Sequence, residues 1–97
     1  MRTKKIIGNQ PEVLLDSTSN VDVGALNIAN IHASDSVDVD LYLSDEDGVY
    51  YIFKNLNIPA GASIYIEGYE LSFPRDVMSL YIKLSANSST VDVIIRN

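Results

Sequence analysis

The sequence predicts an all-β protein, a compact antiparallel β-sandwich of the jelly-roll or immunoglobulin-like type with an extended N-terminal arm. Apolar and polar residues alternate over most of the chain, which is the period of a half-buried strand. Short clusters of Gly, Pro, Asn, Asp and Ser separate the alternating segments, as in small sandwiches and barrels. The 97 residues fit one domain, and a chain this short has a thin margin of stability.

The N-terminal residues 1–19 are expected to form the arm and the first strands, ahead of a sandwich at residues 20–97 in the same domain. Basic residues gather at the start of the arm and two isoleucines follow them: Arg2, Lys4, Lys5, Ile6 and Ile7. A basic arm with an apolar end can lie across an acidic neighbouring copy, with opposite charges guiding its register. The alternative is a frayed, solvated chain end.

Residues 22–32 are the least regular segment. Leu26, Ile28 and Ile31 do not share one strand face, which favours a bulge or a strand buried on both sides. A helix is the rival interpretation. We predict a strand, because Val, Ile and Asn outnumber the strong helix formers in this segment.

The later strands alternate more regularly. Residues 37–43 have four branched aliphatic residues on one face, with two acids and a tyrosine on the other. The same period recurs at residues 64–66, 80–84 and 91–96. Each of these segments is predicted to be a half-buried strand with an inward aliphatic face.

Turn residues join these strands. Residues 44–48 end in Asp-Gly, a pair that tolerates positive φ, and predict a turn between two strands. Residues 59–61, Pro-Ala-Gly, redirect the chain. Residues 85–90 are expected to link the last two strands as a hairpin, while residues 17–20 and 74–76 mark two further corners.

Composition limits the partners. Acidic residues outnumber basic ones by 13 to 7, and the pI is about 4.4. Such a surface repels nucleic-acid phosphates and anionic lipids, so we expect no nucleic acid and no membrane as partner. The start of the chain lacks the apolar core of a signal peptide, and a soluble, non-exported protein is expected. Cysteine is absent, which excludes disulfides, thiolate zinc sites and cysteine nucleophiles.

Few residues suit catalysis or metal binding. His32 is the one histidine, and a transition-metal site there would need carboxylates such as Asp35. A polar residue at the end of a strand is the plainer interpretation. The sequence has no nucleophile elbow. We therefore predict no enzyme, no cofactor, and no catalytic or metal-binding residue.

Acidic residues raise the question of calcium. The acids of residues 45–47 are consecutive, unlike the alternating acids of an EF-hand loop, and favour a solvated turn. Asp38, Asp40 and Asp92 would repel one another on one face, so they are expected on different sheets or around a cation.

Tyrosines are the main candidates for a binding surface. They supply six of the eight aromatic residues. Tyr42 and Tyr81 fall opposite the aliphatic rows, and an outward tyrosine suits protein interfaces and sugar stacking. Cross-strand packing on an exposed face is the alternative. The candidate interface therefore comprises Arg2, Lys4, Lys5, Ile6, Ile7, Tyr42 and Tyr81.

A resemblance to a known group covers roughly residues 25–96. It is carried by NIANIHASDSVDVDLYLSDEDGVYYIFKNLNIPAGASIYIEGYELSF and by SLYIKLSANSSTVDVIIR. Together they resemble small structural proteins of tailed bacteriophages, with alternating strands, an IPAGAS turn and a closing VDVII strand. The resemblance implies a β-sandwich on the virion, where head decoration, neck, tail and fibre proteins all use such modules.

The leading expectation is a non-enzymatic virion structural protein assembled in the host cytoplasm. It would bind the major capsid protein or other virion proteins, bridge neighbouring capsid subunits and so stabilise the particle. We expect a homo-oligomer, with a trimer at the lattice axes as one arrangement. The alternatives are a neck, tail or fibre component, a carbohydrate- or receptor-binding module, and a small calcium-binding sandwich.

Overall fold

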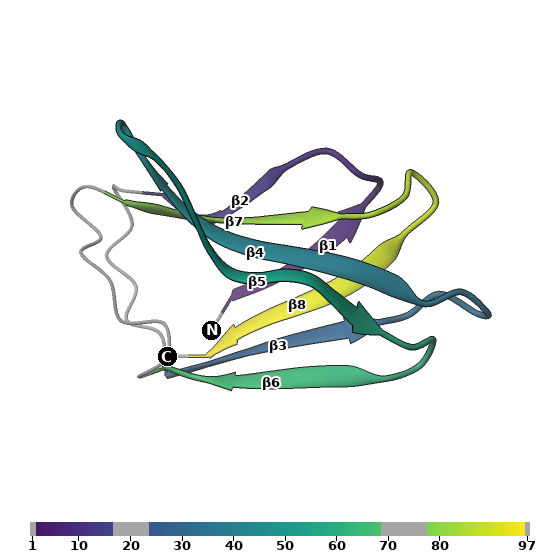
Figure 1. The fold of residues 1–97 in the computed structure, drawn as a ribbon. Helices are drawn as coiled ribbons and strands as arrows, with labels where there is room; N and C mark the ends of the chain where they lie inside the picture. Colours follow the sequence, from purple (N-terminus) through teal and green to yellow (C-terminus); the bar gives the residue numbers. More distant parts are fainter. Residues whose placement is uncertain (1, 17–23, 69–77, 97) are drawn as a thin grey trace.

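The computed structural model describes residues 2–16, 24–68 and 78–96 (Figure 1). These residues form β-strands and no α-helix, which confirms the predicted all-β class. The strands are β1 (Arg2–Ile7), β2 (Glu12–Leu15), β3 (Ala25–Asn30), β4 (Val37–Asp45), β5 (Gly48–Ile58), β6 (Ser63–Glu67), β7 (Ser79–Leu84) and β8 (Thr90–Arg96). No helix in these ranges has the length and apolarity to span a membrane.

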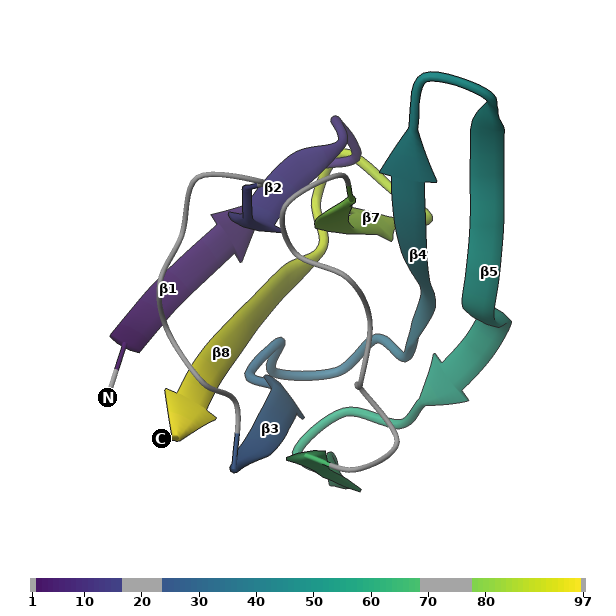
Figure 2. The ribbon, with the colours of Figure 1, turned by 90° about the vertical axis from the view of Figure 1, so that its left-hand side faces the viewer.

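The strands form two sheets that pack face to face (Figures 1 and 2). One sheet has the order β1-β8-β3-β6 and the other β2-β7-β4-β5, and all neighbours are antiparallel. Among the strands that the structure describes, only β4 and β5 are consecutive and paired as a hairpin, because every other two consecutive strands are divided between the two sheets. This order, two interleaved Greek keys of eight strands, is a jelly roll rather than an immunoglobulin-like sandwich.

Aliphatic side chains fill the space between the sheets, as the alternation predicts. The three strands β4, β7 and β8 contribute Val37, Val39, Leu41, Leu80, Ile82, Leu84, Val91, Val93 and Ile95, each at most 3% exposed. Burying one such side chain is worth about 1.5–3 kcal/mol. The core therefore supplies the stability that no disulfide can give this chain.

The predicted N-terminal arm is a strand of the sandwich in this structure. β1 pairs with β8 along its whole length, from Arg2 opposite Ile95 to Ile7 opposite Thr90. It provides partners for backbone groups of β8 that would otherwise form an open sheet edge. The predicted boundary at residues 19–20 lies outside the described residues. β1 and β2, which precede it, belong to the same two sheets as the strands that follow.

Residues 25–30 form a regular strand, β3, in the middle of its sheet. Its register with β6 and with β8 shows no shift, so the bulge that we considered is not present. Leu26, Ile28 and Asn30 share the inner face and are buried. Ile31, whose position broke the pattern, lies beyond the end of the strand and is 44% exposed.

The predicted turn at residues 44–48 is confirmed. Asp45 pairs with Gly48, and Asp45 Oδ1 accepts hydrogen bonds from the backbone N–H groups of Asp47 and Gly48 at 2.8 and 3.1 Å. Residues 59–61 redirect the chain as expected, from β5 in one sheet to β6 in the other. Gly61 has φ +79°, a conformation that favours glycine.

The predicted hairpin at residues 85–90 is wrong. β7 and β8 lie in different sheets, and the loop between them crosses the sandwich. Alternation shows which face of a strand is buried but not which strand is its neighbour. Two packed sheets are about 10 Å apart, which a connection of this length spans easily. The corners expected at residues 17–20 and 74–76 lie outside the described residues.

Four connections gather at one end of the sandwich, on the right in Figure 1. They are the loops β1–β2, β3–β4, β5–β6 and β7–β8. We call this end the loop end. The β4–β5 turn lies at the opposite end.

Candidate functional site

Three tyrosines form a row on the outer face of the β2-β7-β4-β5 sheet. Tyr42 of β4 lies opposite Tyr81 of β7 on one side and Tyr51 of β5 on the other. The rings of Tyr42 and Tyr81 are stacked, with centroids 5.4 Å apart and planes within 5°. The rings of Tyr42 and Tyr51 are tilted by 55° at 5.5 Å. Both distances lie in the favourable range for aromatic pairs.

The row is continued along β5. Val49 lies opposite Ser44, two residues from Tyr42 on β4, so it projects from the same face as Tyr51. Val49 and Tyr51 are 47% and 49% exposed. We call Tyr42, Tyr51, Tyr81 and Val49 the tyrosine face. It offers flat, amphipathic area on a regular part of the sheet.

Charged groups border the tyrosine face on one side. Lys54 Nζ lies 4.4 Å from the centroid of the Tyr51 ring and 3.9 Å from Asp40 Oδ2. Asp40 Oδ1 accepts a hydrogen bond of 2.8 Å from the backbone N–H of Asn55. Asn55 has φ +56°, a conformation that asparagine tolerates, where the register of β4 and β5 shifts. The border is therefore polar, and its charged side chains, Asp40 and Lys54, pair with each other.

The Tyr42 hydroxyl keeps its proton more firmly than a free tyrosine. Partial burial raises its pKa above 10.0, and the nearby Tyr51, Tyr81 and Asp40 raise it further. A neutral phenol both donates and accepts hydrogen bonds. The centre of the tyrosine face therefore carries no charge near neutral pH.

Of the predicted basic residues, Lys4 and Lys5 bind within the chain. Lys5 Nζ forms an ion pair with Asp92 Oδ1 on the neighbouring strand. Lys4 Nζ donates a 2.9 Å hydrogen bond to the carbonyl of Val13 in the other sheet and lies 3.9 Å from Glu12 Oε2. An inward-pointing charge of this kind protects the open side of a sandwich from pairing with other chains. Arg2 is exposed at the start of β1.

The two isoleucines that follow them face opposite ways. Ile6 is 1% exposed and belongs to the core, so its place in the predicted interface has to be corrected. Alternation along a paired strand sends it inward with Lys4. Ile7 is 66% exposed. The structure brings Tyr42 and Tyr81 together but places Lys5 and Ile7 on the other sheet.

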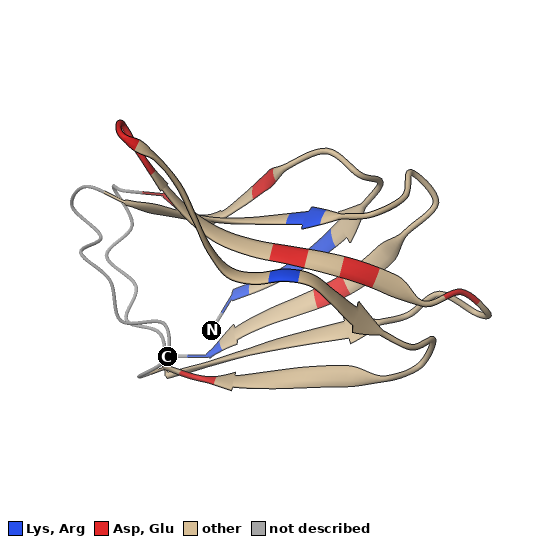
Figure 3. Cartoon of the chain, in the orientation of Figure 1, with Lys and Arg blue, Asp and Glu red and all other residues tan. Residues whose placement is uncertain are grey.

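The predicted separation of the acids agrees with the structure. Asp38 and Asp40 lie on β4, whereas Asp92 lies on β8 in the other sheet. Asp38 Oδ1 accepts a 2.9 Å hydrogen bond from Asn57 Nδ2, and Asp92 pairs with Lys5. Figure 3 shows acidic positions on β4 beside a basic one on β5. Within the described ranges, no three His, Asp or Glu side chains gather as a metal site would require.

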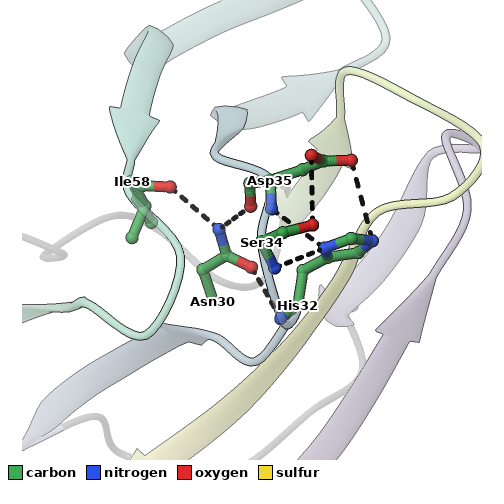
Figure 4. A network of polar contacts seen from close by, with 5 residues as sticks. All are labelled: Asn30, His32, Ser34, Asp35 and Ile58. Atoms are coloured by element: carbon green, nitrogen blue, oxygen red, sulfur yellow. Dashed lines mark hydrogen bonds and ion pairs between the residues drawn. The ribbon is translucent and has the colours of Figure 1, made fainter.

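His32 and Asp35 lie together in the β3–β4 loop (Figure 4). His32 Nε2 is 3.8 Å from Asp35 Oδ2, and its Nδ1 accepts the backbone N–H groups of Ser34 and Asp35. Asn30, which was not predicted from the sequence, holds this loop. The signal was present, because Asn30 is a polar residue that continues the buried row of Leu26 and Ile28.

Comparisons of the sequence with protein-family models, and of the chain with curated proteins and solved structures, give no match.

Proposed function

We propose that this protein is a non-enzymatic binding module that docks on a protein partner through the tyrosine face. We further propose that it is a virion structural protein of a tailed phage, bound to the capsid surface and bridging neighbouring capsid subunits. The observation that carries the docking proposal is the row of three tyrosine rings across β7, β4 and β5. A neck, tail or fibre position is the alternative within the same class.

The tyrosine face has the properties of an interface centre. Tyrosine is enriched at such centres because it buries a large area and keeps a hydroxyl for hydrogen bonding. The rings of Tyr42 and Tyr81 already stack in the free protein, so their ordering costs little on binding. The Asp40–Lys54 pair supplies a polar border, which is the usual arrangement around an apolar centre.

The virion assignment has separate support. The jelly roll recurs in viral capsid domains, but it also occurs in lectins and cupins, so the fold alone does not decide among them. The assignment therefore depends on the resemblance of residues 27–73 and 79–96 to phage structural proteins. On a particle, many copies of a modest contact give strong total binding, and a homo-oligomer would add to this effect.

The test compares matched tyrosine substitutions on the two sheets. Tyr51→Ala combined with Tyr81→Ala removes two rings of the tyrosine face. Tyr65→Ala is the control, because Tyr65 of β6 is 55% exposed on the other sheet. Binding to tailed-phage capsids is measured by co-sedimentation. We expect the double variant to bind at least about tenfold more weakly and the control to bind like the wild type.

Two results would argue against the proposal. If both variants bind equally well, the tyrosine face is not the contact. If the wild-type protein does not bind capsids or tails at all, the virion assignment is wrong. Imaging of labelled protein on intact particles separates the capsid position from the neck and tail positions.

A further inference from the structure

A polar pocket opens at the loop end between the β3–β4 and β7–β8 loops. It has a volume of ≈ 480 Å³. Its polar lining comes from His32, Ser34, Asp35 and Ser36 of the first loop and Ser88 and Ser89 of the second. We call it the loop-end pocket. Sites for small molecules usually measure about 300–1,000 Å³, so its size suits such a ligand.

One wall of the pocket is held rigidly from beneath. Asn30 is 1% exposed, and its Nδ2 donates 2.9 Å hydrogen bonds to the carbonyls of Asp35 and Ile58. Its Oδ1 accepts the backbone N–H of His32 at 3.0 Å (Figure 4). These three hydrogen bonds tie the loop to the ends of β3 and β5. A loop fixed in advance loses little entropy when a ligand binds.

The same loop sets the hydrogen-bonding direction of His32. Its Nδ1 accepts N–H groups from Ser34 and Asp35 at 3.2 and 3.0 Å, so this nitrogen carries no proton in the neutral ring. The proton is therefore on Nε2, which lies 3.8 Å from Asp35 Oδ2. The ring N–H and the carboxylate lie side by side, a donor next to an acceptor.

Ser89 provides a second, independent indication of a ligand. It is 6% exposed and lines the pocket. Its backbone N–H donates a hydrogen bond to the carbonyl of Ala86 at 3.0 Å, and its carbonyl accepts one from the N–H of Gly8 at 2.9 Å. Its hydroxyl has no hydrogen-bond partner among the residues that the structure describes. Buried hydroxyls nearly always have a partner, which is either protein or water, so a ligand in the pocket can replace water at this one.

The side chains that line the pocket determine which class of molecule it can bind. Among the described residues, no Lys or Arg lines the pocket, and Asp35 would repel an anion. A calcium ion prefers six to eight oxygen ligands, and a single carboxylate with serine hydroxyls is a poor set. An apolar ligand would leave the hydroxyls without water or partner. A sugar hydroxyl both donates and accepts, which fits a carboxylate, an N–H and several hydroxyls.

We propose that the loop-end pocket binds a neutral sugar. Asp35 accepts hydrogen bonds from sugar hydroxyls, His32 Nε2–H donates to one, and the Ser89 hydroxyl bonds to another. The pocket lies between loops at the loop end, away from the outer sheet face that carries Tyr42 and Tyr81. The inference therefore does not depend on the proposed docking function.

Amide chemical shifts of the full-length protein test this inference. The probes are glucose, galactose, mannose and N-acetylglucosamine at millimolar concentration, with inorganic phosphate and methylammonium as charged comparisons. We expect at least one neutral sugar to shift the amides of residues 32–36 and 86–89. Shifts caused only by phosphate or methylammonium, or shifts that map to the tyrosine face, would overturn the proposal. So would spectra that no probe changes.

Matched variants identify the groups that bind. Asp35→Asn is expected to weaken sugar binding about tenfold or more, and Ser89→Ala severalfold, because each removes a hydrogen bond to the ligand. Asp47→Asn and Ser63→Ala change exposed residues outside the pocket and should bind as the wild type does. Equal binding by Asp35→Asn, Ser89→Ala and their controls would show that the pocket is not the site.

Discussion

The buried amide of Asn30, at the end of β3, holds the β3–β4 loop and the end of β5 together at the loop end. It bonds to the backbone of His32, Asp35 and Ile58, which belong to the β3–β4 loop and the end of β5. A side chain that satisfies backbone groups in this way stabilises more than an exposed polar pair, because its removal leaves buried groups without partners.

We expect Asn30→Ala to lower the free energy of unfolding by about 2 kcal/mol or more, since each abandoned buried group costs about 1–3 kcal/mol. Asn57→Ala is the control. Asn57 is exposed and makes one side-chain hydrogen bond, to Asp38, so its loss should stay within about 0.5 kcal/mol. Urea denaturation measures both values. A similar small effect of the two substitutions would contradict the structure at Asn30.

The raised pKa of Tyr42 makes stability depend on pH. The folded state favours the neutral phenol, so this contribution is fully present below the unfolded value of 10.0. It is lost as the pH rises through the higher folded pKa, where the partly buried phenol ionises. We expect Tyr42→Phe to reduce the fall in unfolding free energy at pH values above 10.0. Urea denaturation at a series of pH values checks this, and identical profiles would refute it.

At the scale of elements, β1 is the edge strand of its sheet and pairs with β8 alone among the described strands. Its residues alternate between the core, where Ile6 packs, and the outer face, where Ile7 is exposed. Lys4 reaches from the inner face to the carbonyl of Val13 and so joins the two sheets at their open side. β1 is therefore part of the folded domain and not a free arm.

Two neighbouring isoleucines test the role of β1 with the same substitution. Ile6→Ala should lower the unfolding free energy by about 2–5 kcal/mol, because it opens a cavity in the core. Ile7→Ala changes an exposed side chain and should stay within about 0.5 kcal/mol. Thermal and urea denaturation give both values. If residues 2–7 were a free arm in solution, the two substitutions would have equally small effects.

At the scale of the molecule, the jelly roll joins parts of the chain that are far apart. Among the described strands, β1 pairs with β8 and β3 with both β6 and β8, while β4–β5 is the one pair formed by consecutive strands. Pairings between distant segments require large loops to close before any contact forms, which slows folding.

We therefore expect refolding to take milliseconds to seconds, as in other β-sandwiches whose paired strands are far apart in the sequence. Stopped-flow dilution from urea, followed by tyrosine fluorescence, measures this rate in a chain that has six tyrosines and no tryptophan. Refolding within microseconds would contradict a topology in which the first and last strands pair.

Residue patterns predicted some features of the site and missed others. Tyr42 and Tyr81 were correctly placed on outward faces, because the alternation of each strand fixes the side on which a residue lies. Their stacking against each other requires β4 and β7 to be neighbours, which the alternation of residues does not predict. The loop-end pocket was missed for the same reason, since its walls come from two loops separated by some fifty residues.

The sequence by itself determined that this chain forms half-buried strands, which residues face the core, and where tight turns such as 44–48 fall. These properties follow from Cβ geometry and backbone preferences, which act between near neighbours. Only the tertiary structure decided that β1 forms the edge of its sheet, that β7 and β8 lie in different sheets, and that Ser89 and Asp35 line one pocket. Strand partners are chosen by the packing of the whole core, and many pairings share the same local alternation.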